Sequence, residues 1–180
     1  MKKVLYILGL LEDEDIDWMV SVGHREHLNE GDVLITENQP CGSFFILVDG
    51  TVDVSVRGKK IAVITIGEVV GEMSLLDSRP PSATITASSN SIVLRVDFKD
   101  LQARLDSNHR FAARLYKALG VFLAQRLRSI NLQLTVGDTA DIEEFDDDDI
   151  LDDEIDEQVL EKISLAGARF KVIIDKMKNG

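Results

Sequence analysis

The chain has 180 residues and a formal net charge of −12 at pH 7. This length supports one domain with a hydrophobic core plus an appended segment, and the acidic balance argues against nonspecific nucleic-acid binding, which needs clustered Lys and Arg. No apolar run is long enough to span a bilayer, and the single cysteine, Cys41, excludes an internal disulfide and fits a reducing cytoplasm.

A helix from Leu11 to Val22 is the first predicted element. Ile16, Met19 and Val20 fall on one side of it, and acidic residues fill its first turn, where they complement the positive end of the helix dipole. The apolar run before it is too short for a signal peptide and lacks a small-residue cleavage site, so we expect helix there too.

Between His24 and Val96 the pattern changes to short β-branched and aromatic runs separated by glycines. Their close, even spacing predicts an antiparallel roll or barrel. Asp49-Gly50 and Arg57–Lys59 have the composition of hairpin turns. The predicted strands are Val33–Ile35, Phe44–Val48, Val52–Val56, Ile61–Ile64, Ala83–Ala87 and Ile92–Val96.

The most informative stretch is Gly71–Leu76, followed by Arg79–Thr84. A glycine lets the backbone approach a ligand closely, and an acid at a fixed position accepts hydrogen bonds from sugar hydroxyls. Free N–H groups and small polar side chains in a short turn suit a phosphate. The stretch therefore predicts a site for a sugar-linked anion.

The same stretch resembles the phosphate-binding cassette of cyclic nucleotide-binding domains, as in the catabolite activator family and the regulatory subunits of protein kinase A. There the pattern reads Gly-Glu-(Leu/Met)-small-Leu and, after a few residues, Pro-Arg-small-Ala-Thr-Val. The runs Gly31–Ile35 and Phe44–Val54 look like the family's opening glycine turn and central hairpin, with Asn38 where glycine is usual. The resemblance implies a mainly β fold with flanking helices, in which an antiparallel, jelly-roll-like β-roll (a double-stranded β-helix) precedes C-terminal helices.

The resemblance also implies the ligand, cAMP or cGMP, and a set of contacts to it. Glu72 would accept from the ribose 2′-OH, and the backbone around Gly71, Met73 and Ser74 would approach the ribose and phosphate. The phosphate side would be lined by three residues of the later turn: Ser82, Ala83 and Thr84.

One signature position departs from the family, because Pro81 stands where the phosphate-pairing arginine is expected. Proline offers neither a charge nor an N–H, whereas a guanidinium is the usual partner of a desolvated phosphate. Arg79 is the candidate replacement. The alternative is a degenerate roll that binds no nucleotide and serves as an oligomerising adaptor.

Two helices are predicted after the roll. Asp97 is a candidate N-cap of a short helix ending at Leu105, and a longer helix begins at Ser107 or Asn108 and ends near Leu134. In catabolite activator relatives the equivalent long helix pairs two subunits and covers the nucleotide, which implies a homodimer. The alternative is a helix packed on its own roll. By the same resemblance, the part nearest the base would be around Arg126, Leu127 and Ile130.

The acidity lies mainly in one segment, since residues 129–161 hold 14 acidic and no basic side chains. We expect three units: a roll domain over 1–134, a solvated acidic linker over 135–154, and an amphipathic helix over 155–180. This helix either docks a protein partner or folds back on the roll. The segment after the long helix is too short for a winged helix and offers no basic recognition helix, so we expect no direct DNA binding.

Catalysis is not expected. His24 and His27 lie three apart in an extended segment, which points them to opposite faces and disfavours a shared metal. None of the common nucleophile, zinc or P-loop motifs occurs. The sequence predicts a non-catalytic cytoplasmic sensor without metal or cofactor, which signals to a protein partner.

Overall fold

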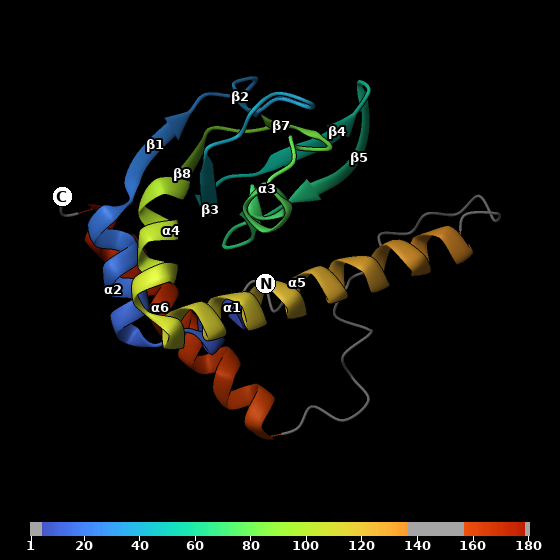
Figure 1. Ribbon diagram of the computed structural model, residues 1–180. Coiled ribbons are helices and arrows are strands. Elements are labelled where there is room, and N and C mark those ends of the chain that lie inside the picture. Colours follow the sequence, from blue (N-terminus) through green and yellow to red (C-terminus); the bar gives the residue numbers. More distant parts are fainter. Residues whose placement is uncertain (1–4, 137–156, 179–180) are drawn as a thin grey trace.

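The computed structural model describes residues 5–136 and 157–178 (Figure 1). Within them, eight strands form two four-stranded antiparallel sheets, ordered β1-β8-β3-β6 and β2-β7-β4-β5. This arrangement confirms the predicted antiparallel roll. The strands are β1 His24–Leu28, β2 Val33–Ile35, β3 Ser43–Asp49, β4 Val52–Val56, β5 Lys59–Ile64, β6 Val69–Val70, β7 Thr84–Ala87 and β8 Ser91–Asp97.

The two predicted hairpin turns have different outcomes. Arg57 and Gly58 have φ of 50° and 77° and join the paired strands β4 and β5, as a tight hairpin requires. Asp49-Gly50 is not a hairpin turn, because β3 pairs with β6 and β8 while β4 pairs with β5 and β7. The chain crosses there from one sheet to the other, which a local turn sequence cannot distinguish from a reversal within one sheet.

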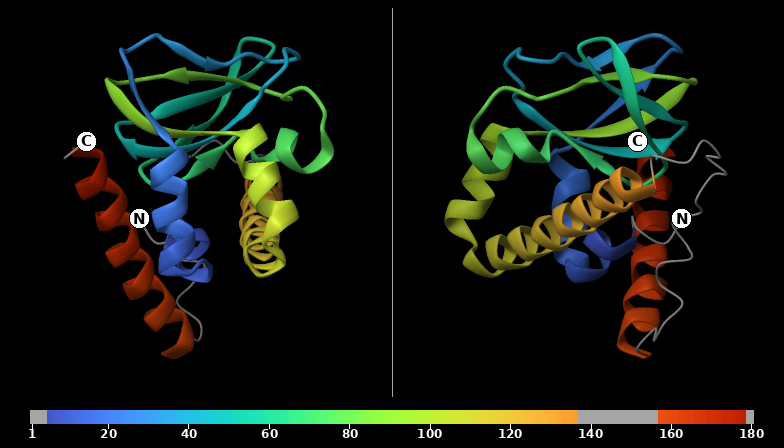
Figure 2. Two further views of the ribbon diagram at one scale, coloured as in Figure 1. Left: turned by 60° about the vertical axis from the view of Figure 1, so that its left-hand side comes forward. Right: turned by 90° about the vertical axis from the view of Figure 1, so that its right-hand side faces the viewer.

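Six helices lie in the described residues, and all except the short α3 gather on one side of the roll (Figure 2). The boundaries predicted for the other helices hold to within a few residues, whereas α3 was predicted only as a turn. Asn108 caps the long helix, since its Oδ1 accepts from the Phe111 N–H at 3.0 Å. The helices are α1 Leu5–Leu10, α2 Asp13–Val22, α3 Glu72–Asp77, α4 Phe98–Ser107, α5 His109–Val136 and α6 Glu157–Lys178.

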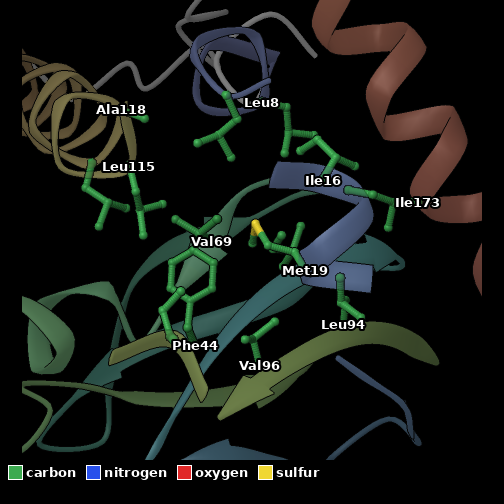
Figure 3. Close-up of a cluster of buried hydrophobic side chains, with 14 of the residues drawn as sticks. Leu8, Ile16, Met19, Phe44, Val69, Leu94, Val96, Leu115, Ala118 and Ile173 are labelled. Atoms are coloured by element: carbon green, nitrogen blue, oxygen red, sulfur yellow. The ribbon is translucent and has the colours of Figure 1, made fainter. Parts of the chain in front are cut away.

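Two hydrophobic clusters hold these layers together. One lies between the sheets and includes Phe45, Leu47 and Ile85. The other lies between the β1-β8-β3-β6 sheet and the helices, where Phe44 and Val96 face Met19 and Leu115 (Figure 3). Alternate residues of β3 thus serve opposite faces of their sheet. Burial on both sides fixes the register of this strand.

The C-terminal helix folds back on the molecule, which was one of the two alternatives for this segment. Ile173 is fully buried against α1 and α2. Arg169 donates to Asp13 Oδ1 at 2.7 Å and to the Leu8 carbonyl oxygen at 3.0 Å. Most of the predicted acidic linker over 135–154 lies outside the described residues, which do not include 137–156.

Among the side chains that the structure describes, the buried ones of the long helix α5 lie only in its stretch up to Phe122. Leu115, Leu119 and Phe122 are buried, whereas Leu127 and Ile130 are 58% and 46% exposed. The helix therefore extends past the body of the protein (Figure 1). Of the helices in the described ranges, none has both the length and the apolarity to cross a membrane.

Candidate ligand-binding site

A hollow of about 770 Å³ opens between the roll, α3 and residues 122–130 of α5. This volume is within the range of small-molecule sites. Its walls are mainly apolar and come from β2, β4, β5, β6, β7 and α5: Ile35, Val54, Ile64, Val70, Ile85, Phe122 and Ile130. A ligand with a flat or apolar body fits such walls, and its polar groups must meet the few polar residues there.

The backbone at the start of α3 requires glycine. Gly71 has φ of 86°, and a Cβ at this position would lie 2.5 Å from the carbonyl oxygen of Ser43. The close approach packs the start of α3 onto β3. It thereby places Glu72, the first helical residue, at the wall of the hollow.

Glu72 is the central polar group of the site. It is only 2% exposed, and its Oε1 accepts from Nη1 of Arg126 on α5 at 2.7 Å. Burial raises the pKa of the Glu72 carboxyl above its ordinary value of 4.5, and the positive charge of Arg126 offsets part of that rise. Glu68 also faces it and raises the pKa slightly further. The carboxylate is therefore held in a weakly solvated place where an additional donor would stabilise it.

Six of the eight residues predicted from the cassette line the hollow: Gly71, Glu72, Met73, Ser74, Ser82 and Ala83. The other two do not. Thr84 Oγ1 accepts from the Glu37 N–H at 3.0 Å. Arg79 has a side chain that is 83% exposed and lies beside Asp77. Pro81 lines the hollow and is buried.

The stretch of α5 from Phe122 to Ile130 supplies the opposite wall. Of the three residues expected near the base, Arg126 and Ile130 line the hollow, whereas Leu127 does not and is 58% exposed. Phe122 and Gln125 also line it and were not predicted, although residues 122, 125, 126 and 130 follow one helix face. That spacing is the signal that could have identified them.

Two details of this wall bear on ligand binding. The Arg126 guanidinium lies 4.6 Å from the centroid of the Phe122 ring, a cation–π contact that holds it in place. Gln125 Oε1 is shielded from solvent and has no hydrogen-bond partner among the described residues. An unpaired acceptor at a ligand-sized hollow is a position that a ligand donor would satisfy.

The hollow has more acidic than basic side chains in its lining. Of the lining residues that the structure describes, Arg126 is the one cation, and Glu68 and Glu72 are the acids. Among the side chains that the structure describes, no group of three or more potential metal ligands gathers.

Comparison with known proteins identifies relatives of this domain and fold. The model of the cyclic nucleotide-binding domain family matches residues 25–108. A cGMP-dependent protein kinase of Toxoplasma gondii is 29% identical over 111 residues, covering 59% of this chain and 11% of the kinase. The catabolite activator protein of Thermus thermophilus has a TM-score of 0.58 at 26% identity, over 69% of this chain and 59% of that chain.

A cyclic nucleotide-binding domain from Methylobacillus flagellatus KT has a TM-score of 0.68 at 20% identity, over 78% of this chain and 85% of that chain, and supports the fold alone. The chain spans about a tenth of the kinase's length, so the match concerns the domain and not the kinase's activity. The matched residues include β2 to β8, β1 from its second residue, α3 and the turn at Pro81, whereas α5 lies beyond them. Since these elements build most of the hollow, residues 25–108 have the family match and the fold of a cyclic nucleotide-binding domain.

Proposed function

We propose that the hollow binds a cyclic nucleotide, cAMP or cGMP, and that the chain is a non-catalytic regulatory protein that reports this binding to a protein partner. The observation that carries the proposal is the placement of Glu72. A 2%-exposed carboxylate at the wall of an apolar hollow has Arg126 as its partner on Oε1. A ribose hydroxyl is a donor that this position accommodates.

The remaining contacts follow from the lining residues. Ser74, Ser82 and the backbone near Gly71, Met73 and Ala83 offer hydroxyl and N–H donors to the ribose and phosphate. The base lies between the apolar strands and α5, whose aromatic and aliphatic side chains cover its faces. Thr84 supports the site indirectly, through its hydrogen bond to the Glu37 N–H.

Ligand binding acts on α5, because this helix forms one wall of the hollow. Tyr116, Leu127 and Ile130 leave an exposed apolar stripe on it, which fits pairing with a second copy in a homodimer. We further propose that residues 1–134 are the sensing unit, that 135–154 are a linker, and that the partner contacts this linker and the helix of 155–180. The lone Cys41 fits a cytoplasmic location.

A second candidate function is an adaptor without nucleotide. Pro81 favours it, because the turn supplies no cation to the hollow and Arg79 lies outside it. In that case the roll is an oligomerising platform, and neither nucleotide raises its melting temperature at millimolar concentration.

Calorimetric titration with cAMP and cGMP tests the proposal. The wild type is expected to bind, and Glu72→Gln to lose about tenfold or more in affinity, because a hydrogen bond to a charged group contributes about 1.5–3 kcal/mol. Glu68→Gln is the matched control, since it removes an acid from the same hollow. Equal losses in both variants would refute the ribose contact, and no binding by the wild type would favour the adaptor.

A further inference from the structure

The proposed nucleotide brings a phosphate into a hollow whose turn offers it no cation, so the role inferred below for Arg126 rests on that proposed function. Pro81 lines the hollow where a positive charge would be needed. The Arg79 side chain is 83% exposed and lies 4.0 Å from Asp77, outside the lining of the hollow. A phosphodiester in a weakly solvated site needs a compensating charge.

Arg126 is the one cation that the described lining residues provide. Its hydrogen bond to Glu72 uses Nη1, whereas a guanidinium carries five N–H donors in a planar fork. The side chain is 31% exposed, so it is neither locked in the core nor fully solvated. The buried Phe122 ring beneath it supports the guanidinium without using its donors.

We propose that Arg126 binds the phosphate of the ligand, so that the long helix α5 supplies the cation that the turn lacks. The ribose hydroxyl then takes the place of Arg126 on Glu72. The exchange satisfies both sides, because the phosphate gains a guanidinium and the buried carboxylate keeps a hydrogen-bond donor. Since Arg126 belongs to α5, the phosphate contact also links ligand binding to the position of this helix.

The test compares a charged ligand with an uncharged one that shares its base and ribose. cAMP and adenosine are titrated into the wild type, Arg126→Gln and the matched control Arg79→Gln. We expect the wild type to prefer cAMP and Arg126→Gln to lose about 10- to 100-fold in cAMP affinity, the range for a hydrogen bond to a charged group. Adenosine affinity should change little, and Arg79→Gln should match the wild type.

Two further variants distinguish a phosphate contact from a structural role of Arg126 and from repulsion by Glu72. Arg126→Lys keeps a charge opposite Glu72 and should recover part of the preference for cAMP, whereas a purely structural role would not depend on ligand charge. In the double variant Glu72→Gln with Arg126→Gln, the net charge of the hollow equals that of the wild type. If this variant regains the preference, repulsion by Glu72 caused the loss and the inference is wrong.

The remaining outcomes separate this inference from the proposed function. Equal weakening of cAMP and adenosine by Arg126→Gln, or loss of the preference in Arg79→Gln, overturns the role of Arg126 and leaves the nucleotide site in place. If the wild type binds adenosine as tightly as cAMP, the role of Arg126 is also overturned and the nucleotide site remains. A wild type that binds neither ligand overturns both proposals.

Discussion

Removing Arg126 should destabilise the ligand-free protein by an amount that depends on pH. In Arg126→Met the apolar stem over Phe122 is kept and the charge facing Glu72 is lost. Breaking a fully buried ion pair by removing one partner costs about 3–5 kcal/mol. The cost here is smaller, because the Arg126 side chain is 31% exposed and solvent screens the pair.

Protonation of Glu72 sets a ceiling on that cost. For a carboxyl with the ordinary pKa of 4.5, protonation costs a free energy of about 3.4 kcal/mol at pH 7 and about 1.4 kcal/mol at pH 5.5. The free energy of unfolding of Arg126→Met cannot fall much further than this protonation cost, because Glu72 can take up a proton instead of remaining charged without a partner. We therefore expect a loss of about 1–3 kcal/mol at pH 7 that shrinks to near zero at pH 4.5.

The sign of the pH dependence is fixed by linkage. The pKa of Glu72 is raised in the folded state, so the folded protein binds more protons than the unfolded one. Its contribution to stability is fully present below pH 4.5 and is lost as the pH rises through the folded pKa. Without Arg126 the folded pKa is higher still, so the loss with rising pH is larger and continues to a higher pH.

Urea denaturation of the wild type and Arg126→Met between pH 5 and 8 measures this difference. Arg128→Met, an exposed arginine on the same helix, is the matched control and should have little effect at any pH. A loss that stays constant across this range, or that persists in a Glu72→Gln background, would show that Arg126 does not act by compensating Glu72.

Three further variants test the surroundings of the site by urea denaturation. Gly71→Ala should lower the free energy of unfolding by more than about 2 kcal/mol, because φ is 86° and the new Cβ meets the Ser43 carbonyl oxygen. Gly58→Ala, also at positive φ but in open space, should lower it by only about 1 kcal/mol. Equal losses would exclude the clash. Gln125→Leu should stabilise the ligand-free protein by about 1 kcal/mol by removing an unpaired acceptor, and a loss of stability would mean that this oxygen has a partner. Ile173→Ala should lose about 2–4 kcal/mol if α6 packs as the structure shows, and a change under about 0.5 kcal/mol would mean that it does not.

The roll could be predicted because its signals are local. Short β-branched runs between glycines mark the strands, and Arg57-Gly58 has the composition of a tight hairpin. Strand pairing could not be predicted, because it joins distant residues, as in the pairing of Phe44 with Val96. The sequence of the turn at Asp49-Gly50 therefore predicts a hairpin, because it does not show that the chain crosses to the other sheet there. The strand β6 has only two residues, which is too short for a recognisable pattern.

The site divides in the same way. Glu72 could be placed from its own neighbours, because the glycine before it and the turn after it are adjacent in sequence. Its partner Arg126 lies 54 residues further along, and only the path of α5 brings the two together. Arg79 is the predicted replacement for the missing arginine because it is close to Pro81 in sequence. Its side chain is exposed instead, since closeness in sequence does not decide where a side chain in a turn points.

The first turn of α2 connects the helix that forms the hollow to the C-terminal helix. Arg114 of α5 donates to both carboxylate oxygens of the buried Asp15, at 2.7 and 3.0 Å. Two residues earlier, Asp13 accepts from Arg169 of α6. The acids of this turn complement the helix dipole, as predicted, and the structure shows that they also hold two other helices.

Arg114 and Arg126 are about three turns apart on α5, so a ligand that shifts this helix at Arg126 also acts on the Asp15 contact. The C-terminal helix is attached to the same turn, and a contiguous set of contacts therefore joins Glu72 to α6.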